Sequence, residues 1–172
     1  DAVDVENQAP IAQAQTQTYL EDAAAQTIVL TATDGDGDPL TFAIQTAPTR
    51  GTLSAITPID ATSASVTYTP NANEFGADSF SFVANDGIVN SLPASVSITL
   101  TPVNDVPAFT AGPTVTILKD IGAQTVDPWA TGISAGPANE SAQTLSFTIT
   151  ANDNPGMFSV QPAVSPTGVL TF

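Results

Sequence analysis

Hydrophobic residues occupy every second position in several short stretches of the chain. In the first of these, Ile28, Leu30 and Ala32 alternate with two threonines and a valine. The same alternation recurs at Leu40, Phe42 and Ile44, at Phe80 and Phe82, and at Val96, Ile98 and Leu100. A period of two with polar residues between predicts antiparallel strands with one buried face. No long segment shows a comparable helical period, so the pattern predicts an all-β fold.

Turn-forming residues separate the predicted strands. Glycine, proline, asparagine or aspartate occur at residues 34–39, 49–51, 69–71 and 85–87, where they favour tight turns. Short strands joined by such turns predict a seven-stranded Greek-key β-sandwich. Burial of each large inward side chain is worth roughly 1.5–3 kcal/mol. This is enough for a core without disulfides, which the absence of cysteine rules out.

The chain contains an internal repeat with a period of about 100 residues, the size of a β-sandwich domain. Segments 7–10, 19–27, 40–44 and 66–68 recur as 104–107, 117–125, 145–149 and 170–172. Nothing in the second copy corresponds to residues 69–101. We therefore predict a linker or strand from a preceding repeat at 1–9, a complete sandwich at 10–103, and a partial second sandwich at 104–172 that lacks its last strands.

Two explanations of the incomplete second copy remain open. The chain is a piece of a longer protein, or a neighbouring chain supplies the missing strands, as in donor-strand complementation. Residues 1–5 alternate like the end of a strand and would be a candidate donor. Five residues, however, cannot replace two strands.

The charge of the chain narrows the classes of partner. It has 17 acidic and 2 basic residues, with a formal net charge of -15, which argues against binding to nucleic acid or anionic lipid. No apolar run is long enough for membrane insertion. With neither His nor Cys, Ser-His-Asp and Cys-His catalysis are excluded. Asp60 and Asp78 are expected to be solvated loop charges.

The most distinctive chemistry lies in the Asp run, residues 34–38. Asp34, Asp36 and Asp38 are separated by single glycines between two predicted strands. Like charges about 4 Å apart repel by about 4 kcal/mol at an effective dielectric constant of 20. A bound cation would offset this repulsion if the run is ordered. Oxygen ligands on a flexible loop favour Ca²⁺ over Zn²⁺. A solvated Asp-Gly turn is the alternative, and Pro39 and Gln45 break the EF-hand pattern.

Other acidic and amide residues lie at the ends of predicted strands. Asp86 follows the strand that contains Phe82, Glu21 follows the first strand, and Asn104 and Asp105 form the joint between the copies. Loops of a sandwich cluster at its two ends. The Asp run and Asp86 are therefore expected to converge at one end, and Glu21 and the joint at the other.

Several of these motifs resemble those of a known family. Residues 33–44 resemble the Asp-x-Asp strand junction of cadherin repeats, residues 82–87 their Ala-x-Asp-x-Gly motif, and residues 103–107 their Asn-Asp-x-Pro linker. Residues 68–82 are closer still to the bacterial cadherin-like, Ig-like repeat of large secreted and surface adhesins. The resemblance covers the first copy almost completely and residues 103–172 more loosely. It implies tandem Greek-key β-sandwich repeats, the second incomplete.

The resemblance also implies a function. It implies a non-enzymatic, secreted or cell-surface structural repeat in which Ca²⁺ at interdomain joints makes the array rigid. Neighbouring repeats or identical subunits would be its partners, together with a cell-surface or glycan ligand. The implied metal ligands are Asn7, Glu21, Asp34, Asp36, Asp38, Glu74, Asp86, Asn104, Asp105, Asn139 and Glu140. The second copy departs from the pattern, with Lys119 in place of Glu21 and residues 134–141 in place of the Asp run.

Two other functions remain as alternatives. One is a subunit of an extracellular filament, assembled by strand complementation between chains. The other is an accessory carbohydrate-binding module of a secreted enzyme, with Trp129 as the sugar platform rather than a core or edge aromatic residue. Paired carboxylates could also serve a glycosidase, but these acids lie in predicted turns without an aromatic cleft.

Overall fold

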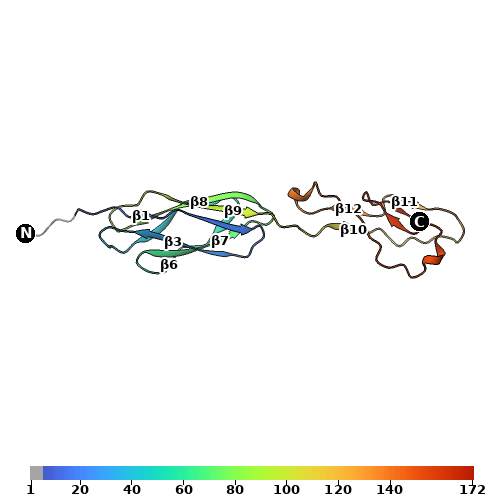
Figure 1. Ribbon diagram of the computed structural model, residues 1–172, viewed down its shortest axis with the longest axis horizontal. Helices are drawn as coiled ribbons and strands as arrows, with labels where there is room; N and C mark the ends of the chain where they lie inside the picture. Colours follow the sequence, from blue (N-terminus) through green and yellow to red (C-terminus); the bar gives the residue numbers. More distant parts are fainter. Residues whose placement is uncertain (1–5) are drawn as a thin grey trace, which may run out of the picture. The chain divides into compact units, whose positions relative to one another are not determined.

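The computed structural model describes residues 6–172, so the predicted donor segment 1–5 lies outside the described residues. The chain divides into two compact units, the first ending at Val103 and the second running from Asn104 to Phe172 (Figure 1). This division falls where the second copy of the sequence repeat begins. Within residues 6–172, no helix is long and apolar enough to cross a membrane.

The described part of the first unit is built from nine strands in two sheets. They are β1 (Ile11–Ala12), β2 (Gln15–Leu20), β3 (Gln26–Thr33), β4 (Thr41–Thr46), β5 (Gly51–Leu53), β6 (Thr57–Pro58), β7 (Ser63–Pro70), β8 (Gly76–Asn85) and β9 (Ala94–Thr101). One sheet has the order β1-β3-β7-β5, with β6 also paired to β7, and the other has the order β2-β9-β8-β4. All pairs are antiparallel except β2 with β9. The predicted all-β fold is confirmed.

The core of the first unit lies between these two sheets. Strands β3, β8 and β9 alternate buried and exposed residues, as their hydrophobic pattern predicts. The buried side chains are Ile28, Leu30, Phe80, Phe82, Val96, Ile98 and Leu100, together with Val66 and Tyr68 of β7. Phe42 and Ile44 of β4 are only partly buried and pack against this cluster. A continuous apolar core therefore stabilises the first unit.

A buried polar pair sits among these hydrophobic residues. The hydroxyl of Tyr68 donates to Asp78 Oδ2 at 2.8 Å, and the backbone N–H groups of Thr49 and Arg50 donate to the same carboxylate at 2.9 and 3.1 Å. Asp78 is 8% exposed, so the prediction that it is a solvated loop charge is wrong. It belongs to β8 on the same face as Phe80, where buried donors need an acceptor.

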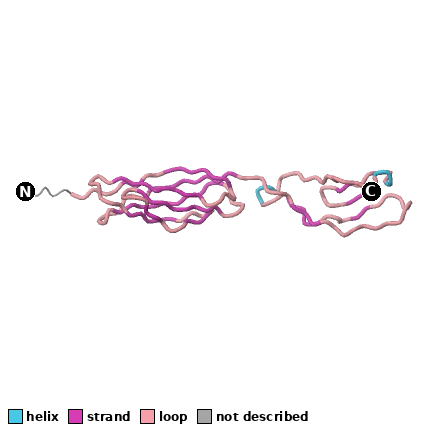
Figure 2. The backbone as a smooth tube through the Cα atoms, turned by 90° about the horizontal axis from the view of Figure 1, so that it is seen from below, coloured by secondary structure: helices cyan, strands magenta, loops and turns pink. Residues whose placement is uncertain are grey.

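The second unit contains shorter strands and more loop (Figure 2). Its elements are β10 (Ala108–Thr110), β11 (Thr125–Val126), β12 (Thr131–Ser134), the 3₁₀ turns η1 (Ala138–Glu140) and η2 (Pro155–Met157), β13 (Ala163–Val164) and β14 (Leu170–Thr171). They form two small sheets, with orders β10-β12 and β11-β14-β13.

These small sheets reproduce one sheet of the first unit. In the sequence repeat, Thr27 and Thr67 correspond to Thr125 and Thr171. Thr27 pairs with Thr67 between β3 and β7, and Thr125 pairs with Thr171 between β11 and β14. Likewise β10 pairs with β12 as β1 pairs with β3. The second copy therefore keeps the register of β3 with β7 in its β11-β14 pair, whereas the pairing of β10 with β12 has a register irregularity between Ala108 and Thr110.

The other sheet has no counterpart among residues 104–172 that the structure describes. In the first unit, β2 and β4 pair with β9 and β8. The repeat aligns residues 117–118 with β2 and residues 145–149 with β4, yet neither segment is a strand. A strand persists only when a neighbour pairs with its backbone, and no strand described within residues 104–172 pairs with either segment. The local sequence of residues 117–118 and 145–149 is therefore not sufficient for strand formation.

Candidate metal site

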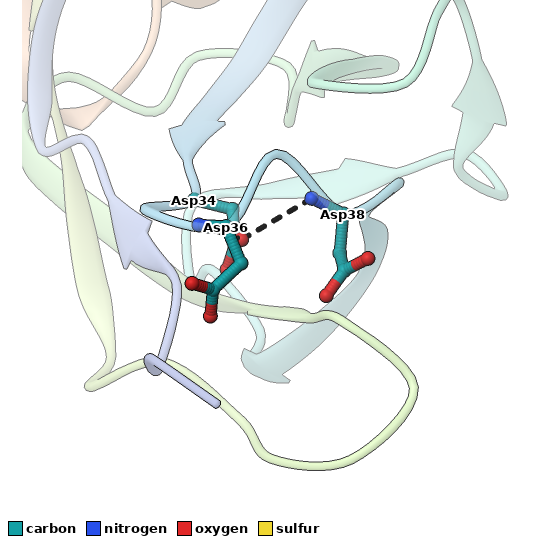
Figure 3. Close-up of side chains that lie close together, drawn as sticks. All are labelled: Asp34, Asp36 and Asp38. Atoms are coloured by element: carbon teal, nitrogen blue, oxygen red, sulfur yellow. Dashed lines mark hydrogen bonds between the residues drawn. The ribbon is translucent and has the colours of Figure 1, made fainter. Parts of the chain in front are cut away.

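The loop between β3 and β4 gathers the Asp run into one cluster. Oxygen atoms of Asp34, Asp36 and Asp38 all lie within 4.8 Å of one another (Figure 3). Asp34 Oδ1 accepts the backbone N–H groups of Asp36 at 2.9 Å and of Asp38 at 3.2 Å, which curls the loop around its carboxylate. Gly37, at φ +81°, supplies the left-handed turn that this path requires. The local sequence thus concentrates three negative charges in one turn.

The residues of this loop fit a calcium ion. Asp34 Oδ2 is buried and has no hydrogen-bond partner among the described residues, an arrangement that is costly for a carboxylate oxygen unless something binds it. Calcium accepts oxygen ligands at 2.3–2.6 Å, so two of its ligand atoms can lie up to about 5 Å apart. The three oxygens, which lie within 4.8 Å of one another, satisfy this limit. All donors are hard oxygens, the type that Ca²⁺ prefers.

The linker before β1 is bound at the same end of the unit. Gln8 donates its backbone N–H to Asp36 Oδ2 at 2.7 Å and its side-chain amide to Asp36 Oδ1 at 3.3 Å. Asn7 donates its side-chain amide to Asp86 Oδ2 at 3.0 Å. The structure therefore brings the Asp run, Asp86 and the Asn7 linker together, although Asp86 lies outside the group of three carboxylates. Gln8, which the repeat aligns with Asp105, contributes donors that the sequence motifs did not predict.

The contact with Asn7 gives a testable pH dependence. The backbone N–H of Val89 and the Asn7 amide hold the pKa of Asp86 below its ordinary value. A lowered carboxylate pKa means that the interaction is present above the ordinary pKa of about 3.9 and is lost as the pH falls through the folded value. We expect Asn7→Ala to raise the pKa of Asp86, measured by NMR titration of its carboxyl carbon. An unchanged pKa of Asp86 would show that Asn7 does not contact it in solution.

The second repeat binds its linker with a different acid. Glu140 Oε1 accepts the backbone N–H of Asp105 at 2.7 Å, and the repeat aligns Asp105 with Gln8. Glu140 therefore accepts the linker N–H in the second repeat as Asp36 does in the first. Glu140 is 4% exposed, and its Oε2 is buried without a hydrogen-bond partner among the described residues. Gly136, at φ +151°, allows this approach because a Cβ at that position would overlap Oε2.

The remaining predicted ligands are placed differently. Glu21 follows β2, is 1% exposed, and its Oε1 accepts the backbone N–H of Val103 at 2.8 Å. Glu74 forms an ion pair with Arg50 in the first unit, so a cation already neutralises its carboxylate. In the second unit Asn104 Oδ1 accepts the side-chain amide of Gln143 at 2.9 Å, and Asn139 belongs to η1 beside Glu140. Because Arg50 occupies its carboxylate, Glu74 is not a ligand in the calcium site that we propose.

Trp129 is engaged within its own unit. It is half-buried, and its indole N–H donates to the backbone carbonyl of Pro113 at 3.2 Å. A Cβ at Gly112 would overlap the Trp129 backbone, which shows how closely the two segments approach. These contacts agree with an edge aromatic residue more than with an open sugar platform.

Two facing sheets, with loops gathered at their ends, define the first unit as an immunoglobulin-like β-sandwich. The chain belongs to the bacterial Ig domain family, whose model matches residues 7–99, more than half of the chain. No curated protein sequence matches it significantly.

Solved structures of several proteins match part or most of this chain. The endo-fucoidan hydrolase MfFcnA4 from glycoside hydrolase family 107 is 23% identical over 59% of this chain and 15% of its own, with a TM-score of 0.47. The Yersinia pseudotuberculosis adhesin InvE is 19% identical over 59% of this chain and 28% of its own, with a TM-score of 0.39. The Ig1-2 module of the Drosophila receptor protein tyrosine phosphatase DLAR is 13% identical over 96% of this chain and 83% of its own, with a TM-score of 0.35. The chain thus spans a small part of the first two proteins.

Proposed function

We propose that this chain is a non-enzymatic structural module of an extracellular adhesin or fibre, and that Ca²⁺ binding to the Asp run makes the linker before the repeat rigid. Membership of the bacterial Ig domain family supports an extracellular, non-catalytic module. The observation that carries the calcium proposal is the buried, unpartnered Asp34 Oδ2 within a cluster of three carboxylates.

The proposed mechanism is mechanical. Asp36 already binds Gln8 through two hydrogen bonds, so fixing the position of its carboxylate also fixes the linker. Calcium would supply a positive charge that offsets the mutual repulsion of the Asp34, Asp36 and Asp38 carboxylates. Glu140 binds the corresponding linker position in the second repeat. We therefore propose the same principle there, with Glu140 as the principal acid.

The expected energy of binding is modest. Extracellular calcium modules bind with dissociation constants of about 10⁻⁴–10⁻³ M, so millimolar Ca²⁺ largely fills them. At a tenfold excess over the dissociation constant, ligand binding stabilises the folded state by only about 1.4 kcal/mol. Calcium should therefore affect the order of the linker more than the survival of the fold.

Calorimetric titration of the full chain with CaCl₂ tests this proposal. We expect Asp34→Asn and Asp36→Asn each to weaken the first calcium site at least about tenfold, because each removes a charged oxygen ligand. Asp60→Asn is the matched control: it makes the same change of charge on an exposed residue of the same unit. Equal calcium affinity in all four proteins would overturn the proposal.

A second measurement separates linker ordering from simple binding. Hydrogen exchange of the Gln8 amide, which donates to Asp36, should slow when Ca²⁺ is added to the unmodified chain. It should not slow in Asp34→Asn, where the Asp36 contact is retained but a ligand is lost. If calcium binds but leaves the Gln8 amide unchanged, the metal site stands and the mechanical role is wrong.

A further inference from the structure

We infer that Asp36 and Gly37 form a chemical modification site, at which the aspartate isomerises to isoaspartate when the linker releases its carboxylate. Isoaspartate forms without an enzyme where aspartate precedes glycine, because glycine has no side chain to hinder attack by its backbone nitrogen. The chain has three such pairs, at residues 34–35, 36–37 and 86–87. The structure distinguishes the three pairs, and the inference does not require calcium.

The reaction closes a succinimide ring and then opens it with water. The Gly37 nitrogen forms a bond to Cγ of Asp36 in its carboxylic-acid form, and the N–H proton leaves with the hydroxyl group as water. Solvent water then adds to the ring and breaks the bond between this nitrogen and the Asp36 backbone carbonyl carbon. The main chain now runs through Cγ, which adds a methylene group to the loop, and the free carboxylate is attached directly to Cα.

Asp86 is protected from this reaction because its carboxylate is fully engaged. Its Oδ1 accepts two backbone N–H groups of the same turn at 2.7 and 2.8 Å, and its Oδ2 accepts the Asn7 amide at 3.0 Å. The attacking nitrogen would be that of Gly87, whose N–H donates to Asn85 Oδ1 at 2.7 Å. Both reacting groups are therefore held away from each other, and reaction requires local opening of the turn.

Asp34 is also held in place. Its Oδ1 accepts two backbone N–H groups of its own loop at 2.9 and 3.2 Å, and the residue is half-buried. The Gln8 side chain lies so close to Gly35 that a Cβ there would overlap it. Turning the Asp34 carboxylate toward the Gly35 nitrogen would break both hydrogen bonds. Asp38 has no such route, because Pro39 carries no N–H.

Asp36 and Gly37 are less constrained. Both are exposed, and a Cβ on Gly37 would meet no atom within 4 Å. Within residues 6–172, the Asp36 carboxylate accepts hydrogen bonds from Gln8 alone, at 2.7 and 3.3 Å. The linker therefore protects this carboxylate, and opening of the linker frees it to react. Isomerisation then moves the carboxylate away from Gln8, so the modification is a lasting record of linker opening.

Peptide mapping by mass spectrometry tests the inference. The full chain is incubated at neutral pH with a calcium chelator in heavy-oxygen water, which labels each ring that has opened, and isoaspartate is located by fragmentation. We expect at least about fivefold more isoaspartate at Asp36 than at Asp34 or Asp86, since hydrogen bonds within the unit hold the other two. A synthetic peptide of residues 33–44 is the unstructured reference, in which Asp34 and Asp36 should react at similar rates.

A pair of variants tests the role of the linker. Gln8→Pro removes both the backbone and the side-chain donor to Asp36 and should raise its rate of isomerisation at least about threefold. Ala9→Pro is the matched control: it makes the same type of change at the next residue of the linker, which does not contact Asp36 in the described structure, and should leave the rate unchanged. Absence of isoaspartate at Asp36, as much at Asp86 as at Asp36, or an Asp36-to-Asp34 ratio no higher than in the peptide would each overturn the inference. An unchanged rate in Gln8→Pro, or equal acceleration in Ala9→Pro, would overturn it too.

Discussion

Replacing Phe82 by alanine is expected to lower the free energy of unfolding of the first unit by about 3–5 kcal/mol, the usual cost of removing a buried phenylalanine side chain. Phe82 is fully buried in the centre of β8 and its ring lies 6.1 Å from that of Phe42. Because both sheets already enclose it, little rearrangement can fill the cavity. Urea denaturation followed by circular dichroism measures the loss.

Phe75→Ala is the matched control for this prediction. Phe75 belongs to the same unit but is 42% exposed, so its truncation removes little buried area and should cost less than about 1 kcal/mol. Similar losses in the two variants would show that the first unit has no closed core in solution. In that case the first unit would not differ from the second in having an enclosed core.

Asp78→Ala is expected to destabilise the first unit by about 3 kcal/mol, because it strips the acceptor from several donors at once. Tyr68, Thr49 and Arg50 all donate to this carboxylate, and the Tyr68 side chain is fully buried. Tyr68→Phe removes only one of these hydrogen bonds and should cost about half as much. Asp60→Ala, at an exposed turn of the same unit, is the control and should change stability far less.

The Asp78 interaction also predicts how acid affects stability. Burial alone would raise the pKa of Asp78, but the hydrogen bonds from Thr49 and Tyr68 outweigh burial and lower it. The stabilisation is therefore complete above the unfolded pKa of about 3.9 and is lost as the pH falls through the lower folded value. Below about pH 4, the free energy of unfolding should fall more steeply in the unmodified chain than in Asp78→Asn. Parallel pH profiles would contradict this account.

The alternating pattern was sufficient to predict the strands and the core of the first unit. A period of two is a local property, and it places Ile28 and Leu30 on one face whatever the strand pairs with. Similarly, the spacing of the Asp run is enough to bring Asp34, Asp36 and Asp38 together, because a single turn connects them.

Which acids are buried was decided by residues far away in the sequence. Asp78 looks like a loop charge in the sequence, and only its position opposite Tyr68 shows that it is a buried acceptor. The Arg50 contact of Glu74 and the Asp105 contact of Glu140 are equally non-local. The residues next to a carboxylate in the sequence do not show which hydrogen-bond donor will contact it after folding.

The sequence by itself determined the two copies, their strand pattern and the position of the Asp run, because each depends on neighbouring residues. Only the tertiary structure decided that residues 145–149 are not a strand, although the repeat aligns them with β4. The physical reason is that a β-strand is stabilised by the backbone of another strand. The described structure provides that partner in the first unit and not in the second.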